Sequence, residues 1–476
     1  MNANKLTSIN TFMLVSLIFS MPVVLLNIQY FDDIARTVVG YYGWSNDGRP
    51  LVDIIYKLLS LNGNIVDLYP LPQIASYLLL GYACHLLSYR FGLGVFSGVA
   101  ITAPIICSPM LVGNTLFRYD SISMAISMFL CVIPLTYTFK SNVIKIVSTS
   151  ALILTSLMLY QAAFSIFILL SLVSFSYSLI HNGDFKIELK ALVFNALSTI
   201  IGYCLYVISS SFAFNMSPSA AGRSSLISFD SIGFDSFIMA SKKSLMVMFG
   251  SYPSLLIYIV SIILTLSISY KIISSNVKKY KIQNLSLCIF AMVLCIPVTF
   301  FLVALTKHPA IYPRSYMSFG FLVFGVYLII YTCGMRKIAV SLSCITVVLM
   351  LSFNAKILHA VEIVNRSQMD AAKMIAWSLK ESGGSFEDVV IATPMGEPKE
   401  LTKIYDEHYY ANRIIWMHFT NQFASYLVSY NGYKIGLPSK NTIEIVRSHT
   451  PDWSVIDSNN IFTLYAFDKH AVVEFK

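Results

Sequence analysis

Charged residues are scarce in this sequence. Only 12% of its 476 residues are Asp, Glu, Lys or Arg, whereas soluble domains carry about 25%. Hydrophobic residues make up 56% of the chain. This balance excludes an ordinary soluble domain and indicates an integral membrane protein. The net charge of +9 is then explained by basic membrane loops, so we expect the lipid bilayer as a partner and no nucleic acid.

Other features are missing as well. All eight cysteines fall within apolar stretches, which argues against a disulfide framework in the loops. No compact group of His, Cys, Asp or Glu has metal-ligand spacing, so we expect no metal and no other cofactor. No nucleotide-binding glycine loop and no internal repeat are visible. The first apolar stretch lacks a small-residue cleavage site, and we expect it to remain as an anchor.

Long apolar runs are what the chain has in abundance. At ~20 residues per crossing, we predict about eleven membrane spans. They lie near residues 8–28, 72–90, 94–113, 119–139, 142–160, 162–181, 190–212, 245–270, 285–306, 316–333 and 338–356. The basic residues of the loops favour a cytoplasmic N-terminus by a small margin, which places a long first loop, 29–71, on the outer face.

The end of the chain has a different character. Residues 357–476 contain a predicted helix over 361–379 and strand-like runs at 388–392, 461–467 and 471–475. We therefore predict a small α/β domain on the outer face, following a membrane domain of residues 1–356.

Acidic residues of the membrane part are unevenly distributed. Only Asp184 and Glu188 fall on the predicted inner side. The others are all aspartates of the outer face, namely Asp32, Asp33, Asp47, Asp53, Asp67, Asp120, Asp230 and Asp235. An outer face that mixes both signs of charge suits polar chemistry, while a basic inner face is ordinary for a membrane protein.

Two of these aspartates, Asp32 and Asp33, are adjacent at the point where the first apolar stretch ends. Carboxylates beside hydrocarbon are costly, so they suggest a functional site. One interpretation is a general base that accepts the proton of an attacking hydroxyl, with the two carboxylates titrating as a coupled pair. The other is a solvated helix end or the N-cap of the following helix. The residues alone leave both open.

Basic side chains gather in two further outer segments. Lys307, His308 and Arg314 flank two prolines that restrict the backbone, and Arg118 lies two residues before Asp120. Such side chains suit an anion such as phosphate. The alternatives are snorkelling toward lipid headgroups and, for Arg118, a simple ion pair with Asp120.

The first outer loop also carries aromatic residues. Trp44 lies in a turn-rich stretch, 43–50, between two amphipathic segments at 34–39 and 51–59 that we expect to be helical. Trp44 could stack on a sugar ring, although aromatic belts at membrane interfaces are the usual use of such residues. For the outer turn Tyr160-Gln161, a capping role is the simpler interpretation.

Together these motifs resemble those of the bacterial and phage O-antigen glucosyltransferases of the Gtr type, the serotype-converting, GtrII-like enzymes. The likeness covers residues 10–320. It is carried by the span that ends in Phe31-Asp32-Asp33, by the stretch 41–50 with its Trp-Ser-Asn-Asp-Gly-Arg-Pro sequence, by the turn 117–120 and by the loop 307–314. The tail is less diagnostic.

The resemblance implies a polytopic all-α enzyme of the GT-C architecture with a small α/β periplasmic C-terminal domain. Its donor would be glucose on polyprenyl (undecaprenyl) phosphate, supplied by a bactoprenol glucosyltransferase and a flippase. Its acceptor would be a sugar hydroxyl of the lipopolysaccharide O-antigen, and transfer would occur at the periplasmic face of the bacterial inner membrane.

The resemblance also implies roles for particular residues. Asp32 or Asp33 would be the catalytic base, and direct displacement would invert the anomeric centre. We expect the donor phosphate to be bound by Arg314, Lys307, His308 and Arg118, and the substrates to be contacted by Trp44, Asn46, Asp47, Arg49, Asp120 and Tyr312.

Two other functions are open alternatives. A transporter or flippase of a lipid-linked sugar would place ionisable groups near the bilayer midplane. An O-antigen polymerase would not need the aspartate pair.

Overall fold

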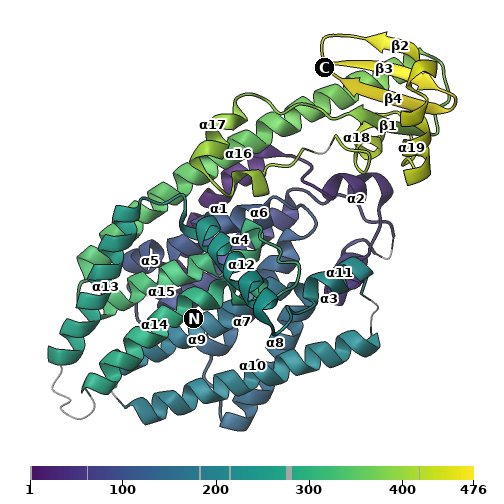
Figure 1. Ribbon diagram of the computed structural model, residues 1–476. Helices are drawn as coiled ribbons and strands as arrows, with labels where there is room; N and C mark the ends of the chain where they lie inside the picture. Colours follow the sequence, from purple (N-terminus) through teal and green to yellow (C-terminus); the bar gives the residue numbers. More distant parts are fainter. Residues whose placement is uncertain (1–2, 62, 182–183, 214–215, 275–280, 418) are drawn as a thin grey trace. The chain divides into compact units, whose positions relative to one another are not determined.

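The protein is mostly helical (Figure 1). The computed structural model describes residues 3–476 except 62, 182–183, 214–215, 275–280 and 418. The chain divides into two compact units. The first comprises Met1–Leu25, Gly43–Leu59 and Tyr69–Ala355, and the second comprises Leu26–Tyr42, Ser60–Leu68 and Lys356–Lys476. The first outer loop therefore contributes to both units.

The first unit is built from apolar helices. Those that precede the long C-terminal helix are α1 (Ala3–Leu26), α3 (Pro50–Leu59), α4 (Leu71–Arg90), α5 (Val95–Cys107), α6 (Pro109–Thr115), α7 (Ser121–Thr136), α8 (Asn142–Leu159), α9 (Phe164–His181), α10 (Phe185–Ala213), α11 (Pro218–Ser224), α12 (Ser231–Phe249), α13 (Ser254–Ser274), α14 (Lys281–Ala304) and α15 (Phe319–Thr332). Short 3₁₀ turns occur at η1 (Trp44–Asp47), η2 (Gln161–Ala163) and η3 (Pro313–Tyr316).

Among the described residues, eight helices are long and apolar enough to cross a membrane, or nine if the bent pair α5–α6 is one span. This confirms a multi-pass membrane protein with fewer candidate spans than the expected eleven. Helix α4 is not among them; its polar side chains Gln73, Ser76, His85 and Ser88 are buried in the protein. Helix α7 has only 16 residues, and α5 and α6 meet at an angle of 61°.

Two of the expected spans have different boundaries in the structure. The run at 245–270 is interrupted, because α12 ends before Gly250 and α13 begins after Pro253. The expected span at 338–356 and the expected tail helix at 361–379 are one continuous helix, α16 (Arg336–Glu381), of 46 residues. Residues 351–365 contain neither Pro nor Gly, so nothing in the local sequence ends the helix at the change in composition.

The second unit contains a four-stranded sheet with the order β1-β4-β3-β2. Its strands are β1 (Asp388–Thr393), β2 (Ser454–Ser458), β3 (Phe462–Phe467) and β4 (His470–Phe475), and only the β1–β4 pair is parallel. The shorter helices and turns of this unit are α2 (Asp33–Val39), α17 (Leu401–Glu407), η4 (Ala411–Arg413), α18 (Ala424–Tyr430), α19 (Lys440–Ser448) and η5 (Thr450–Asp452). The three predicted strands are confirmed, while the short and polar β2 was not predicted.

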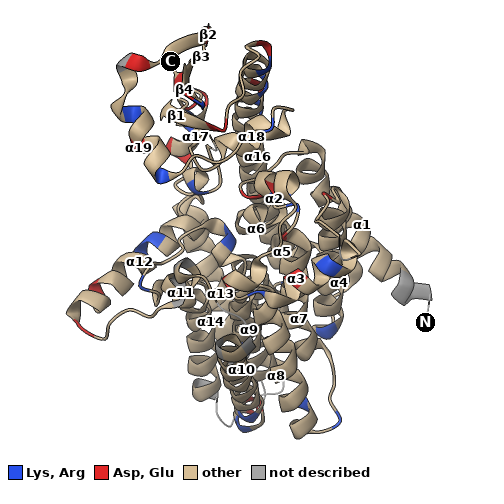
Figure 2. Cartoon of the chain, turned by 90° about the vertical axis from the view of Figure 1, so that its right-hand side faces the viewer, with Lys and Arg blue, Asp and Glu red and all other residues tan. Residues whose placement is uncertain are grey.

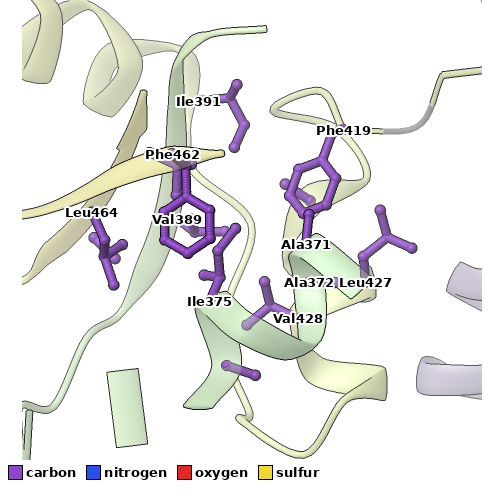
Figure 3. Close-up of a cluster of buried hydrophobic side chains, with 14 of the residues drawn as sticks. Ala371, Ala372, Ile375, Val389, Ile391, Phe419, Leu427, Val428, Phe462 and Leu464 are labelled. Carbon is purple, nitrogen blue, oxygen red and sulfur yellow. The ribbon is translucent and has the colours of Figure 1, made fainter. Parts of the chain in front are cut away.

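The hydrophobic core of the second unit joins the first outer loop to the tail of the chain. Ile34 of α2 is buried in the same cluster as Ile375 of α16, Val389 of β1, Leu427 of α18 and Phe462 of β3. Figure 3 shows the side chains that the tail contributes. Helix α2 is thus held by residues more than 300 positions later in the sequence, which the apolar pattern of the loop alone did not indicate.

Candidate active site

The two adjacent aspartates differ in their exposure. Asp33 is the first residue of α2 and is fully buried, at 0% exposed, whereas the Asp32 side chain is 28% exposed. Asp32 occupies the N-cap position of α2, but its side chain makes no capping hydrogen bond. Instead its Oδ2 atom lies 3.4 Å from Nη2 of Arg36, one turn along the helix. Of the pair, Asp32 presents the more accessible carboxylate.

The backbone before Asp32 is held in an uncommon conformation. Phe31 has a φ of +52°, which is rare for a bulky residue. Its ring packs against Trp416 and Phe423, at centroid distances of 4.7 and 5.5 Å. The hydroxyl of the preceding Tyr30 donates to the carbonyl of Ile414 at 2.7 Å. Aromatic residues of the tail therefore fix the turn that orients the aspartate pair.

In the first unit, the turn-rich stretch 43–50 is organised by Asp53. This carboxylate, on the first turn of α3, accepts from the backbone N–H groups of Gly43, Trp44 and Ser45 at 3.0, 3.1 and 2.7 Å, and from the Ser45 hydroxyl. Burial raises the pKa of Asp53, but these hydrogen bonds outweigh it, and the pKa lies below its usual value. From the sequence, Asp53 was expected only as one of the aspartates of the outer face.

The same stretch is tied to the turn after α6. The indole N–H of Trp44 donates to Oδ1 of Asp120 at 2.8 Å, and Nη1 of Arg49 donates to the same oxygen at 2.7 Å. Trp44 is fully buried and stacks on Tyr56 at 4.9 Å. Asp47 extends the network through an ion pair with Arg49 at 3.3 Å. Through these contacts, Trp44 and Asp120 stabilise the conformation of the loop.

Gln161 forms a further set of hydrogen bonds to the 43–50 stretch. Its Nε2 atom donates to the carbonyls of Asp47 and Gly48, both at 3.1 Å, and to the hydroxyl of Tyr206 at 2.9 Å. Tyr206 in turn donates to the Gly48 carbonyl at 3.0 Å. Gly48 has a φ of +75° and stands so close to both side chains that a Cβ would clash with the Tyr206 hydroxyl. The glycine of the motif is therefore required at this position.

The predicted cations fall into two groups. Arg314, on η3, lies with its guanidinium over the rings of Phe117 and Tyr312, at 4.9 and 5.6 Å. Arg118 is buried and covers the ring of Tyr69 at 4.4 Å. Asp120 forms its ion pair with Arg49, at 2.7 Å.

Lys307 and His308 form the second group, and both are exposed. The backbone N–H of Lys307 donates to the carbonyl of Ser225 at 2.8 Å. This bond attaches the start of the predicted cationic loop to the segment after α11. Asn46 is also exposed, and its carbonyl accepts from the N–H of Ser217 at 2.9 Å.

Arg314 and Arg49 share a neighbour in Tyr160, the residue between α8 and η2. Burial raises the pKa of Tyr160, and the two guanidinium groups act in the opposite direction. The side chain of Asn114 also acts to lower the pKa of Tyr160, and its Nδ2 donates to the carbonyl of Arg314 at 3.4 Å. The loop motif and η3 therefore meet in one polar cluster, which we call the Arg49–Arg314 cluster, made of Arg49, Asp120, Tyr160, Asn114 and Arg314.

A family model described as Glucosyl transferase GtrII matches residues 21–333. The chain belongs to the GtrII family. The matched region includes the aspartate pair, the 43–50 stretch and the whole Arg49–Arg314 cluster, and it ends before α16. The chain is also 27% identical over 209 residues to a Salmonella phage P22 protein described as an uncharacterized 55.3 kDa protein in the gtrB 5′ region. That similarity spans 43% of this chain and 42% of the phage protein. No solved structure matches the chain.

Within this GtrII chain, the structure distributes the predicted site residues over both units. Asp32 and Asp33 belong to the second unit, and all the predicted donor-binding and substrate-contacting residues belong to the first. Asn114, Tyr160, Gln161 and Tyr206 were not predicted as site residues. Their only signal in the sequence is a polar group inside or beside an apolar helix. In the part of the chain that the structure describes, no group of three His, Cys, Asp or Glu residues is placed to hold a metal ion.

Proposed function

We propose that this protein is an inverting glucosyltransferase of the GT-C architecture. It transfers glucose from polyprenyl (undecaprenyl) phosphate to a sugar hydroxyl of the lipopolysaccharide O-antigen, at the periplasmic face of the inner membrane. Membership of the GtrII family over residues 21–333 is the observation that carries this proposal. A bactoprenol glucosyltransferase and a flippase would supply the donor.

The proposed reaction is a single displacement. The acceptor oxygen forms a bond to the anomeric carbon as the bond from that carbon to the phosphate oxygen breaks. The acceptor proton passes to a carboxylate, and the electron pair leaves with the polyprenyl phosphate. We assign the base to Asp32, because its carboxylate is partly exposed while that of Asp33 is buried.

The leaving phosphate gains negative charge as the bond breaks. A cation already in place stabilises that charge more strongly in the transition state than in the ground state. We assign this role to Arg314, with Lys307 and His308 attracting the anionic donor. The guanidinium packs against the aromatic faces of Phe117 and Tyr312, which position it without neutralising its charge.

The test compares three Asp→Asn variants in membranes supplied with polyprenyl-phosphate glucose and O-antigen. Asp32→Asn should lower the rate of glucose transfer by ~10²–10⁴-fold, because the base is lost. Asp235→Asn, at an exposed position on α12, is the matched control and should retain the wild-type rate. Asp33→Asn tests the choice between the two aspartates.

If both Asp32→Asn and Asp33→Asn transfer glucose at the wild-type rate, at normal levels of folded protein, the assignment of the base is wrong. A large loss with Asp33→Asn alone would move the role to the buried aspartate. Formation of a new glucosyl linkage with the anomeric configuration of the donor would contradict the single displacement.

A further inference from the structure

A second polar site lies at the other end of helix α8 from the Arg49–Arg314 cluster. Here the ends of α4, α7 and α9 and the starts of α8 and α10 surround a cavity of about 300 Å³. The cavity is lined by polar side chains that the proposed transfer reaction does not use, among them Arg90, Lys145, Ser171, Ser178, Glu188 and Asn195. Helix α8 has 18 residues and is therefore ~27 Å long, so the cavity is separate from the cluster that begins at Tyr160.

The side chain of Asn195 leaves one hydrogen-bond acceptor in this cavity without a donor. Its side chain is only 6% exposed, and Nδ2 donates to the hydroxyl of Ser171 at 3.2 Å. Its Oδ1 atom is buried and has no hydrogen-bond partner in the described structure. Burial of an amide oxygen without a hydrogen-bond donor is destabilising, so a group that donates a hydrogen bond is expected there.

The mouth of the cavity carries net positive charge. Lys145 interacts electrostatically with both Arg90 and Glu188, which places two cations and one carboxylate together. Arg90 is oriented by donation from its Nε atom to the carbonyl of Leu135 at 3.1 Å. In Figure 2 the ribbon is coloured for Lys and Arg at several positions near the lower ends of α8 and α10. Because cations outnumber carboxylates at the mouth, the cavity favours an anionic ligand. The carboxylate of Glu188 can accept a second hydrogen bond from that ligand.

The surroundings of the cavity are apolar. Tyr137 before α8, Val143 and Val147 on α8, and Ile187 on α10 are all exposed large hydrophobic residues. In a multi-pass membrane protein such residues face lipid, so a ligand held here would have hydrocarbon beside it. A soluble phosphate ester would gain nothing from that surface, whereas a lipid tail would.

We propose that this cavity binds the headgroup of an anionic phospholipid whose headgroup carries hydroxyls. Arg90 and Lys145 contact the phosphate. One headgroup hydroxyl donates to Oδ1 of Asn195, and another donates to Glu188. Phosphatidylglycerol has this chemistry, with one negative charge and two hydroxyls. The site is independent of the proposed glucose transfer, because none of its residues belongs to the Arg49–Arg314 cluster or to the aspartate pair.

The experiment measures lipid binding by native mass spectrometry on the full-length protein in a mild non-ionic detergent. Phosphatidylglycerol is the probe, and phosphatidylethanolamine and glycerol 1-phosphate are compared at equal concentration. Phosphatidylglycerol should bind best. Lys145→Met and Asn195→Leu should each weaken its binding about tenfold, since each removes one contact to the headgroup. Lys186→Gln, an exposed position in the first turn of α10 that does not line the cavity, should leave binding unchanged.

Three results would overturn the proposal. Equal phosphatidylglycerol binding by the wild type, Lys145→Met and Asn195→Leu would show that the lipid binds elsewhere. Equal binding of phosphatidylethanolamine would contradict an anionic headgroup. Binding of glycerol 1-phosphate with the affinity of the lipid and the same loss in Lys145→Met would show a soluble ester as the occupant. Lys145 is not buried, so its variant tests the site even if Asn195→Leu fails to fold.

Discussion

The Asp53 carboxylate accepts hydrogen bonds from three successive backbone N–H groups, those of residues 43–45. Such bonds favour the ionised carboxylate and lower its pKa from its usual value. The stabilisation they provide is present above the unfolded-state pKa and is lost as the pH falls through the lower, folded-state pKa. The shape of the motif that contains Trp44 and Arg49 thus depends on one ionised side chain.

Acid should therefore loosen this loop. We expect the opening free energy of the Gly43–Ser45 amides, measured by hydrogen exchange, to be constant from pH 7 to about pH 4 and to fall below that. In Asp53→Asn the opening free energy should already be lower at pH 6 by about 1–3 kcal/mol, because a neutral amide accepts these bonds less strongly. A wild-type profile that stays level down to pH 2 would contradict this role of Asp53.

The polar or aromatic character of a residue can be read from the sequence, but the residue with which it interacts often cannot. Residues 43–50 and 117–120 were expected to belong to the site because they resemble motifs of the Gtr-type enzymes. The sequence did not indicate that Asp120 would pair with Arg49 instead of Arg118, because that contact joins positions 71 residues apart. Long-range pairing depends on how the helices pack, which periodicity in one segment does not encode.

Helix α2 has only seven residues, too few to be stable alone in water. Its stability comes from packing, because Ile34 is buried in the core of the second unit while Val39, near the other end, is 54% exposed. The same packing holds the backbone that precedes it, through the contacts of Phe31 with Trp416 and Phe423.

The two positions of α2 offer a matched comparison. Ile34→Ala should reduce the opening free energy of α2 by about 2–4 kcal/mol, through lost burial and the cavity left behind. Val39→Ala should change it by less than about 0.5 kcal/mol. Hydrogen exchange of the α2 amides in the full-length protein measures both. Similar effects of the two substitutions would mean that α2 is not held by the tail core.

Elements were predicted well where one local pattern decides the structure. The strands at 388–393, 462–467 and 470–475 follow from β-branched and aromatic runs, and both loop segments, at 34–39 and 51–59, are helical as expected. The expected break between a span ending at 356 and a helix beginning at 361 was wrong, because both belong to α16. The drop in hydropathy after residue 356 marks a change of surroundings, whereas helix continuity depends on the backbone preferences of the residues there.

The molecule as a whole consists of two units, and the second is assembled from three separate parts of the sequence. Segment 26–42 is also joined to segment 60–68, since Gln29 donates to Asp67 at 3.3 Å and the Ile65 N–H donates to the Gly40 carbonyl at 3.4 Å. Residues 356–476 supply the remainder of the core.

Removal of the tail should therefore expose the aspartate segment. In a chain ending at Ala355, we expect trypsin to cleave after Arg36 at least tenfold faster than in the full-length protein, where Arg36 is 4% exposed. Cleavage after Lys57, on the exposed face of α3 in the first unit, is the internal reference and should be unchanged. Mass spectrometry of the fragments gives both rates. Equal rates at Arg36 in the two chains would contradict a discontinuous second unit.

The interrupted second unit also imposes an order on biosynthesis. Residues 26–42 leave the ribosome early, but their core partners begin at Lys356, roughly 290 residues after Leu68. At about 5–20 residues per second, ~15–60 s pass between synthesis of the aspartate segment and the start of synthesis of the tail. During that time the membrane helices can insert while the turn before Asp32 still lacks the aromatic contacts that fix it. A nascent chain would therefore acquire its proposed base only when synthesis is nearly complete.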